Sequence, residues 1–139
     1  IMDGDVSGAL ATCVPDSPVD VLMGTGGAPE GVLAACAMRA LGGDMQGQLA
    51  FRNDEERARA RTMGLADPDQ VLTLTDLAGD GDVLFAATGV TDGDFLKGVR
   101  FTSEGATTHS MVMRSGTGTV RTLTSTHDFE RGHGRPYLD

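Results

Sequence analysis

The predicted fold depends on one stretch of the sequence, Val19-Asp20-Val21-Leu22-Met23-Gly24-Thr25-Gly26-Gly27-Ala28-Pro29-Glu30-Gly31. Four of its first five residues are apolar, which is typical of a strand buried on both faces, as parallel strands beneath helices are. The glycines that follow allow the backbone to turn sharply. Pro29 suits the first turn of a helix, because its φ is already helical and it has no N–H to leave unpaired. The stretch therefore predicts a buried strand, a glycine turn and a helix that begins at Pro29.

The glycine turn would present backbone N–H groups at the positive end of a helix dipole, which is a general site for anions such as phosphate. The turn departs from the dinucleotide-binding pattern Gly-x-Gly-x-x-Gly, because Pro29 occupies the position of the last glycine. It also departs from the P-loop pattern, because no Lys-Ser or Lys-Thr follows the glycines. Glu30 would repel a phosphate unless a divalent cation bound both groups. Metal-assisted phosphoryl chemistry is one hypothesis, and the alternative is that Glu30 only complements the helix dipole.

Length and composition indicate a single domain with a negative net charge. The chain has 139 residues, and its 20 acidic and 11 basic side chains give a net charge of −9, which argues against binding to nucleic acid or to an anionic membrane. Cys13 and Cys36 lie in apolar helical stretches and favour reduced thiols. Nothing resembles a leader or a membrane span, so we expect a soluble, cytoplasmic protein. Ile1-Met2 is typical of the end of a strand, so we also expect the chain to be a fragment.

Two acids stand before the first predicted helix, which covers residues 6–13. In Asp3-Gly4-Asp5, the Asp5 carboxylate could cap the helix and Asp3 could stabilise the turn before it. Alternatively, paired acids on a loop between a strand and a helix could bind sugar hydroxyls or a metal. The local sequence favours capping.

A second apolar run, residues 83–87, predicts another buried parallel strand. The polar loop after it carries Asp92 and Asp94 as candidate oxygen ligands. Ligands of open α/β sheets bind beyond the carboxyl ends of the strands, so we expect this loop to share a site with the glycine turn. The alternative is that Asp-Gly-Asp is only a turn signal, because it also occurs at residues 80–82, where it links a helix to a strand.

The remaining elements follow from local signals. Asn53, with Glu56 three residues later, predicts a capping box and a helix whose arginines line a solvated face. Residues 99–102, 107–113 and 119–126 favour strands, and Ser115-Gly116-Thr117-Gly118 predicts an antiparallel hairpin between the last two. His109 in this region is interpreted as a hydrogen-bonded structural residue.

Several blocks together closely resemble the class II fructose-1,6-bisphosphatases: Asp3-Gly4-Asp5, Met23-Gly24-Thr25-Gly26-Gly27-Ala28-Pro29-Glu30-Gly31, Gly42-Gly43-Asp44-Met45-Gln46-Gly47, Phe85-Ala86-Ala87-Thr88-Gly89-Val90-Thr91-Asp92-Gly93-Asp94 and Gly105-Ala106-Thr107-Thr108-His109-Ser110. The resemblance covers only the C-terminal part of the family's chain. It implies, over residues 1–127, part of a layered α/β sandwich with a mixed sheet, the fold of metal-dependent sugar phosphatases related to inositol monophosphatases. We expect residues 128–139 to form a disordered tail.

The resemblance also implies an activity and its residues. The family hydrolyses the 1-phosphate of fructose-1,6-bisphosphate with Mn²⁺ or Mg²⁺, in gluconeogenesis, and some members also act on sedoheptulose-1,7-bisphosphate. Glu30 matches a carboxylate ligand of the metal, and Gly27 matches a backbone contact to the substrate. Asp3, Gly4 and Asp5 match a segment that binds the sugar bisphosphate, so here the resemblance favours binding over capping.

The rest of that site, including the catalytic residues and most metal ligands, belongs to the family's N-terminal part. The resemblance therefore implies that this chain alone is inactive, that its partner is the missing N-terminal part, and that the complete enzyme is a homo-oligomer. The alternative from a different class is a non-catalytic α/β module that binds a phosphorylated metabolite at the glycine turn.

Overall fold

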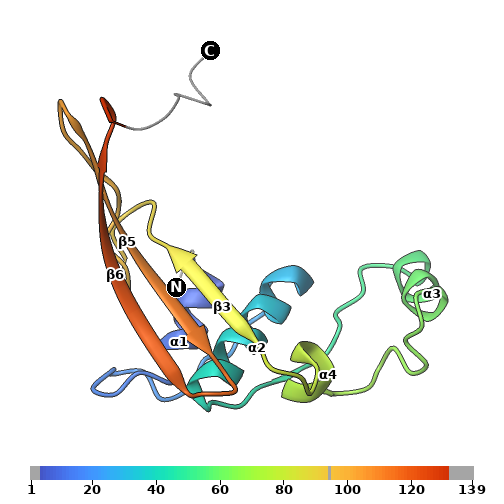
Figure 1. The fold of residues 1–139 in the computed structure, drawn as a ribbon. Coiled ribbons are helices and arrows are strands. Elements are labelled where there is room, and N and C mark those ends of the chain that lie inside the picture. Colours follow the sequence, from blue (N-terminus) through green and yellow to red (C-terminus); the bar gives the residue numbers. More distant parts are fainter. Residues whose placement is uncertain (1–3, 94, 132–139) are drawn as a thin grey trace.

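A computed structural model describes residues 4–93 and 95–131 of the chain (Figure 1). Asp3 and Asp94, which the sequence marks as candidate ligands, lie outside the described residues. The described elements, in chain order, are α1 (Asp5–Ala11), α2 (Ala28–Leu41), β1 (Gln46–Gly47), α3 (Asp54–Thr62), β2 (Leu72–Thr73), α4 (Leu74–Ala78), β3 (Leu84–Thr88), β4 (Arg100–Phe101), β5 (Gly105–Arg114) and β6 (Thr119–Asp128). Helices on one side and a sheet on the other confirm an α/β chain.

The helical layer is built around α2. This helix begins one residue before the predicted Pro29 and ends at Gly42, whose φ of 79° is left-handed and therefore suits glycine. Its buried face is rich in alanine, which lets α1 lie close beside it, with Ala9 among the buried contacts of Ala34 and Met38. Small side chains on α2 thus allow α1 to pack along it.

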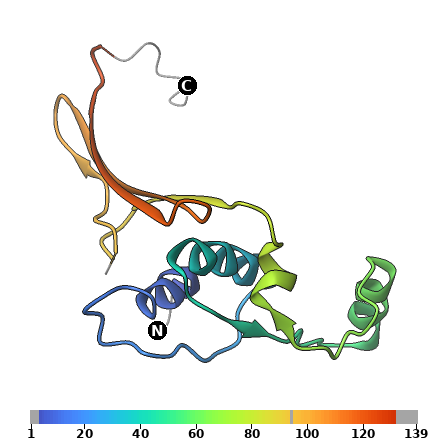
Figure 2. The ribbon, with the colours of Figure 1, turned by 60° about the horizontal axis from the view of Figure 1, so that its bottom comes forward.

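The sheet is organised around β5, which pairs with β3 and β4 on one side and with β6 along its whole length on the other. The predicted hairpin is confirmed, because Arg114 faces Thr119 across the turn. One face of the sheet lies over the helices (Figure 2), where Phe85 and the fully buried Met113 pack with Leu10 and with alanines of α2. This contact is the main core of the chain.

The predicted parallel strand over residues 83–87 is wrong in direction. β3 is antiparallel to β5, and every strand pair in the described part of the chain is antiparallel, so the expected mixed sheet is not observed there. Only one face of β3 is buried: Phe85 packs in the core, whereas Leu84 is 68% exposed. The apolar run indicates that the strand tends to be buried, and parallel and antiparallel strands share this tendency.

The predicted buried strand over residues 19–23 is also not observed. The segment is neither helix nor strand, and Val21 and Met23 are 69% and 89% exposed. In Figure 2 this segment is part of the blue loop between α1 and α2, which extends away from the helices. A strand needs a neighbour to pair with its N–H and C=O groups, and no described residue provides one here.

Helix α3 lies at the end of an arm that projects from the rest of the chain (Figures 1 and 2). Asn53 caps it by accepting a hydrogen bond from the Glu56 N–H at 2.9 Å. In the predicted capping box, the Glu56 carboxylate would accept a hydrogen bond from the Asn53 N–H. It accepts hydrogen bonds from the backbone N–H and the side chain of Arg52 instead. None of the residues of α3 is buried, as expected for a solvated charged helix.

The C-terminal boundary differs slightly from the prediction. β6 includes Asp128, the first residue of the predicted tail, and residues 132–139 lie outside the described range. Within the described ranges, no helix combines the length and the apolar character needed to cross a membrane.

Candidate metal and substrate site at the glycine turn

The candidate site is the turn that leads into α2. Gly27 is the residue before the helix, with φ −70° and ψ 144°, and no side chain caps the helix there. The first N–H groups of a helix have no partner within it, so this end of α2 is open to an acceptor from outside. Glu30 lies in the first turn of the same helix.

Two carboxylates pack against consecutive glycines of this turn. A methyl group at Gly26 would overlap Oδ2 of Asp5, and a methyl group at Gly27 would overlap Oε2 of Glu30. Because neighbouring Cα atoms are about 3.8 Å apart, both carboxylates lie over a short piece of backbone. The structure thus brings together three of the predicted site residues, Asp5, Gly27 and Glu30.

Gly4 and Asp5 lie at the start of α1. Gly4 has a left-handed φ of 80°, and Ser7 donates its hydroxyl to the Gly4 carbonyl at 2.7 Å. Asp5 is already the first helical residue, and no side chain caps α1. The prediction from local sequence that Asp5 caps this helix is therefore wrong, because the helix begins one residue too early. Its carboxylate is directed to the glycine turn instead.

The two carboxylates are exposed, and the five ion pairs of the described residues involve neither of them. Carboxylate oxygens are the ligands that hard divalent cations such as Mg²⁺ and Mn²⁺ prefer, so Asp5 and Glu30 fit part of such a site. The described residues contain no group of three or more His, Cys, Asp or Glu side chains placed to hold a metal.

Asp92, by contrast, is already satisfied by its own loop. It accepts hydrogen bonds from the Gly98 N–H at 2.9 Å and from Arg100 at 2.6 Å. The Gly98 N–H, and then Arg100, lower the pKa of the Asp92 carboxyl. These contacts favour the alternative that Asp92 is a turn residue rather than an oxygen ligand.

Asp82 has a larger structural role than the simple link that the sequence indicates. Its carboxylate accepts from the Gly116 N–H at 2.7 Å and from the side chains of Arg114 and Ser115, so it ties the start of β3 to the β5–β6 turn. The Gly116 N–H, and next Arg114, lower its pKa. This contact joins residues 34 positions apart, which no local pattern could indicate.

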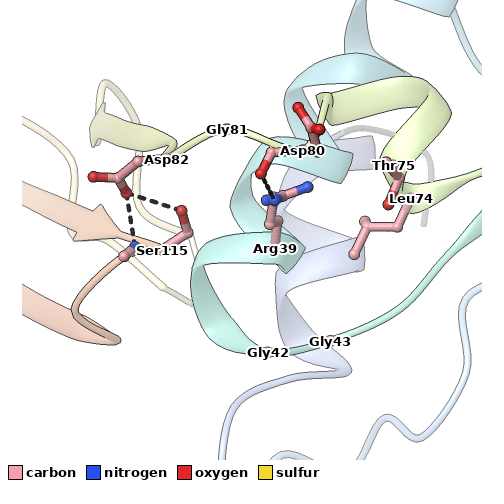
Figure 3. A pocket seen from close by; sticks show the side chains of 10 residues that line it. Arg39, Gly42, Gly43, Leu74, Thr75, Asp80, Gly81, Asp82 and Ser115 are labelled. Carbon is pink, nitrogen blue, oxygen red and sulfur yellow. Dashed lines mark hydrogen bonds between the residues drawn. The ribbon is translucent and has the colours of Figure 1, made fainter.

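An open hollow lies between this turn and the end of α2 (Figure 3). Arg39 borders it, but its guanidinium is held by the backbone carbonyls of Gly79 and Asp80. None of the predicted site residues lines it. The side chains of Arg39 and Asp82 make contacts within the fold, so we do not assign a ligand to the hollow.

The histidines and cysteines agree with structural roles. The ring of His109 lies 3.2 Å from the Thr124 hydroxyl, and that of His127 lies 3.0 Å from the Thr108 hydroxyl. Both described cysteines are free thiols, as predicted.

Comparisons with known proteins identify the family of the chain. The family model described as "Bacterial fructose-1,6-bisphosphatase, glpX-encoded" matches residues 1–127, and the chain belongs to this family. It is 43% identical over 144 aligned residues to "Fructose-1,6-bisphosphatase 1 class 2" of Escherichia coli (strain K12) and equally similar to "Fructose-1,6-bisphosphatase class 2" of Shigella flexneri. These alignments cover 94% of this chain and 43% of each relative, so the chain spans less than half the length of the curated relatives it matches.

Proposed function

We propose that this chain contributes the glycine-turn half of the active site of a metal-dependent sugar bisphosphatase that hydrolyses the 1-phosphate of fructose-1,6-bisphosphate in gluconeogenesis. The observation that carries the proposal is the packing of Asp5 and Glu30 on Gly26 and Gly27, in a chain that belongs to the fructose-1,6-bisphosphatase family. The contact of Asp5 with Gly26 joins separate segments of the chain beside Glu30, which supports a shared role for the two acids.

Each site residue has a proposed role. Glu30 is a ligand of a divalent cation, Mn²⁺ or Mg²⁺, and Gly27 contacts the substrate through its backbone. Asp3, Gly4 and Asp5 bind the sugar bisphosphate, with Asp5 as a hydrogen-bond acceptor for its hydroxyls. The cation, when bound, neutralises phosphate charge and favours attack by water. The exposed carboxylates and the uncapped start of α2 support these roles.

The complete enzyme would need more than this chain. We propose that its partner is the N-terminal part of the same enzyme, which supplies the remaining metal ligands and the catalytic residues. The complete fold would be a layered sandwich related to inositol monophosphatases, assembled as a cytoplasmic homo-oligomer, with residues 1–127 as its C-terminal domain. The chain's coverage of 43% of the relatives' length supports this division.

The test compares the chain alone with the completed enzyme. Phosphate release from fructose-1,6-bisphosphate should stay at the level of the metal-only control for this chain alone. It should reach an ordinary enzymatic kcat, on the order of 1–10³ s⁻¹, when the portion of the Escherichia coli relative that this chain does not match is placed ahead of it. Turnover by the chain alone would contradict a divided site. A folded but inactive fusion that still bound fructose-1,6-bisphosphate would instead support the non-catalytic binding module.

A further inference from the structure

The segment of residues 19–23 has apolar side chains that nothing in the described structure covers. In an extended conformation the side chains would alternate between two faces, with Val19, Val21 and Met23 on one face and Asp20 and Leu22 on the other. Val21, Leu22 and Met23 are 69%, 41% and 89% exposed. Consecutive large apolar side chains that are exposed favour an interaction surface, whereas single exposed apolar residues are ordinary.

The backbone of the segment is also unpaired. Val19 donates its N–H to the Ser17 hydroxyl at 3.3 Å, and no backbone hydrogen bond joins residues 20–26 to other residues in the described ranges. Unpaired N–H and C=O groups along an extended apolar segment form a template for adding a strand. The sequence pattern of a buried strand and the exposed backbone therefore point to the same missing neighbour.

The apolar face of the segment indicates what covers it. If two copies of this chain paired through residues 19–23, the resulting two-stranded ribbon would leave both of its faces in water. The apolar face of Val19, Val21 and Met23 requires a layer packed against it, and the strand requires a neighbouring strand at its edge. More than half of the length of the curated relatives lies outside the alignment with this chain, which is enough polypeptide to supply both.

We propose that residues 19–23 form a docking strand, which becomes an interior strand by pairing with the portion of the enzyme that this chain does not span. The inference rests on the proposed function, because it takes that portion as the partner. The strand leads directly into the turn of Gly26, Gly27 and Glu30, so its docking also holds the candidate metal ligand at a set place relative to groups of the partner. A turn that follows a paired strand holds its side chains in a more precise position than a turn within a free loop does.

Amide hydrogen exchange of residues 19–24 tests the docking. The chain alone should exchange these amides rapidly, and their exchange should slow by roughly a hundredfold or more in the fusion with the unmatched portion of the Escherichia coli relative. Amides of α3, which is exposed and locally stabilised, provide the internal control and should change little. Fast exchange at residues 19–24 in the fusion overturns the proposal. So does concentration-dependent protection in the chain alone, which would show pairing with a second copy.

Matched variants separate docking from folding. In an experiment where the two portions are produced as separate chains, Leu22→Asp should weaken their association at least tenfold, whereas Met63→Asp should leave it unchanged. Met63 is 82% exposed and lies at the end of α3, so both variants place a charge at an exposed apolar site of the isolated chain. Thermal melts of that chain should be the same for both. Equal effects on association would overturn the proposal.

The outcome for docking is independent of the outcome for function. Protection of residues 19–24 without phosphate release would retain the docking strand and refute the bisphosphatase activity. Phosphate release without protection would retain the activity and refute the docking strand.

Discussion

Gly27→Ala provides a direct test of the geometry of the turn. Gly27 has φ −70° and ψ 144°, a conformation that alanine adopts without strain. The added methyl group would, however, overlap Oε2 of Glu30. The carboxylate must then retreat by about 1 Å to restore ordinary contact, and a misplacement of this size can cost about 10²-fold in rate. This loss corresponds to about 2.7 kcal/mol of transition-state stabilisation.

The assay is steady-state phosphate release by the complete enzyme at several Mn²⁺ or Mg²⁺ concentrations, with thermal melts beside it. We expect kcat/KM to fall about 10²-fold, with stability unchanged or slightly raised, because alanine restricts the unfolded chain more than glycine does. Gly24→Ala is the matched control, because it lies in the same turn and a methyl group there meets nothing within 4 Å. If Gly27→Ala kept full activity, or if Gly24→Ala lost as much, the packing of Glu30 on Gly27 would not support the site.

Four further outcomes follow from the same structure. Glu30→Gln should leave melts unchanged, because the carboxylate is exposed, but should raise the metal requirement and lower kcat severely in the complete enzyme. Asp5→Ala should lower kcat/KM by about 1–3 kcal/mol, measured with the bisphosphate, without the stability loss expected of a removed cap. Phe85→Ala should lower the free energy of unfolding by about 3–5 kcal/mol in urea titrations, because it empties the main core. Asp82→Ala should weaken the hairpin contact and flatten the acid side of the stability profile. Since the Gly116 N–H and its neighbours lower the pKa of Asp82, the wild-type contribution is complete above the usual aspartate pKa and is lost as the pH falls through the lowered value.

Three of these variants have a control within the chain. Glu55→Gln removes an exposed acid from the first turn of α3 and should not alter the metal requirement. Leu84→Ala changes the exposed neighbour of the core phenylalanine and should cost about 0.5 kcal/mol or less. Asp80→Asn should leave the free energy of unfolding at neutral pH unchanged, because the hydrogen bond from Arg39 uses the backbone carbonyl of Asp80. Control effects equal to those of the tested variants would contradict the assigned contacts.

Local signals in the sequence determined the helices and the hairpin. Pro29 and Gly42 enclose α2 because their backbone preferences act within one turn of helix. Asn53 caps α3 for a similarly local reason, since donor and acceptor are three residues apart. Glu30 and Gly27 could be proposed as site residues from the sequence because both lie within a single turn of the chain.

Only the tertiary structure decided how separate segments meet. Asp5 reaches the glycine turn because the alanine-rich face of α2 lets α1 lie beside it, and Asp82 meets the hairpin turn across 34 positions. The direction of β3 and the exposure of residues 19–23 were predicted wrongly for one physical reason. The apolar composition of a segment indicates how strongly it tends to be buried. The rest of the fold decides which other segment buries it, and a local sequence pattern carries no information about that segment.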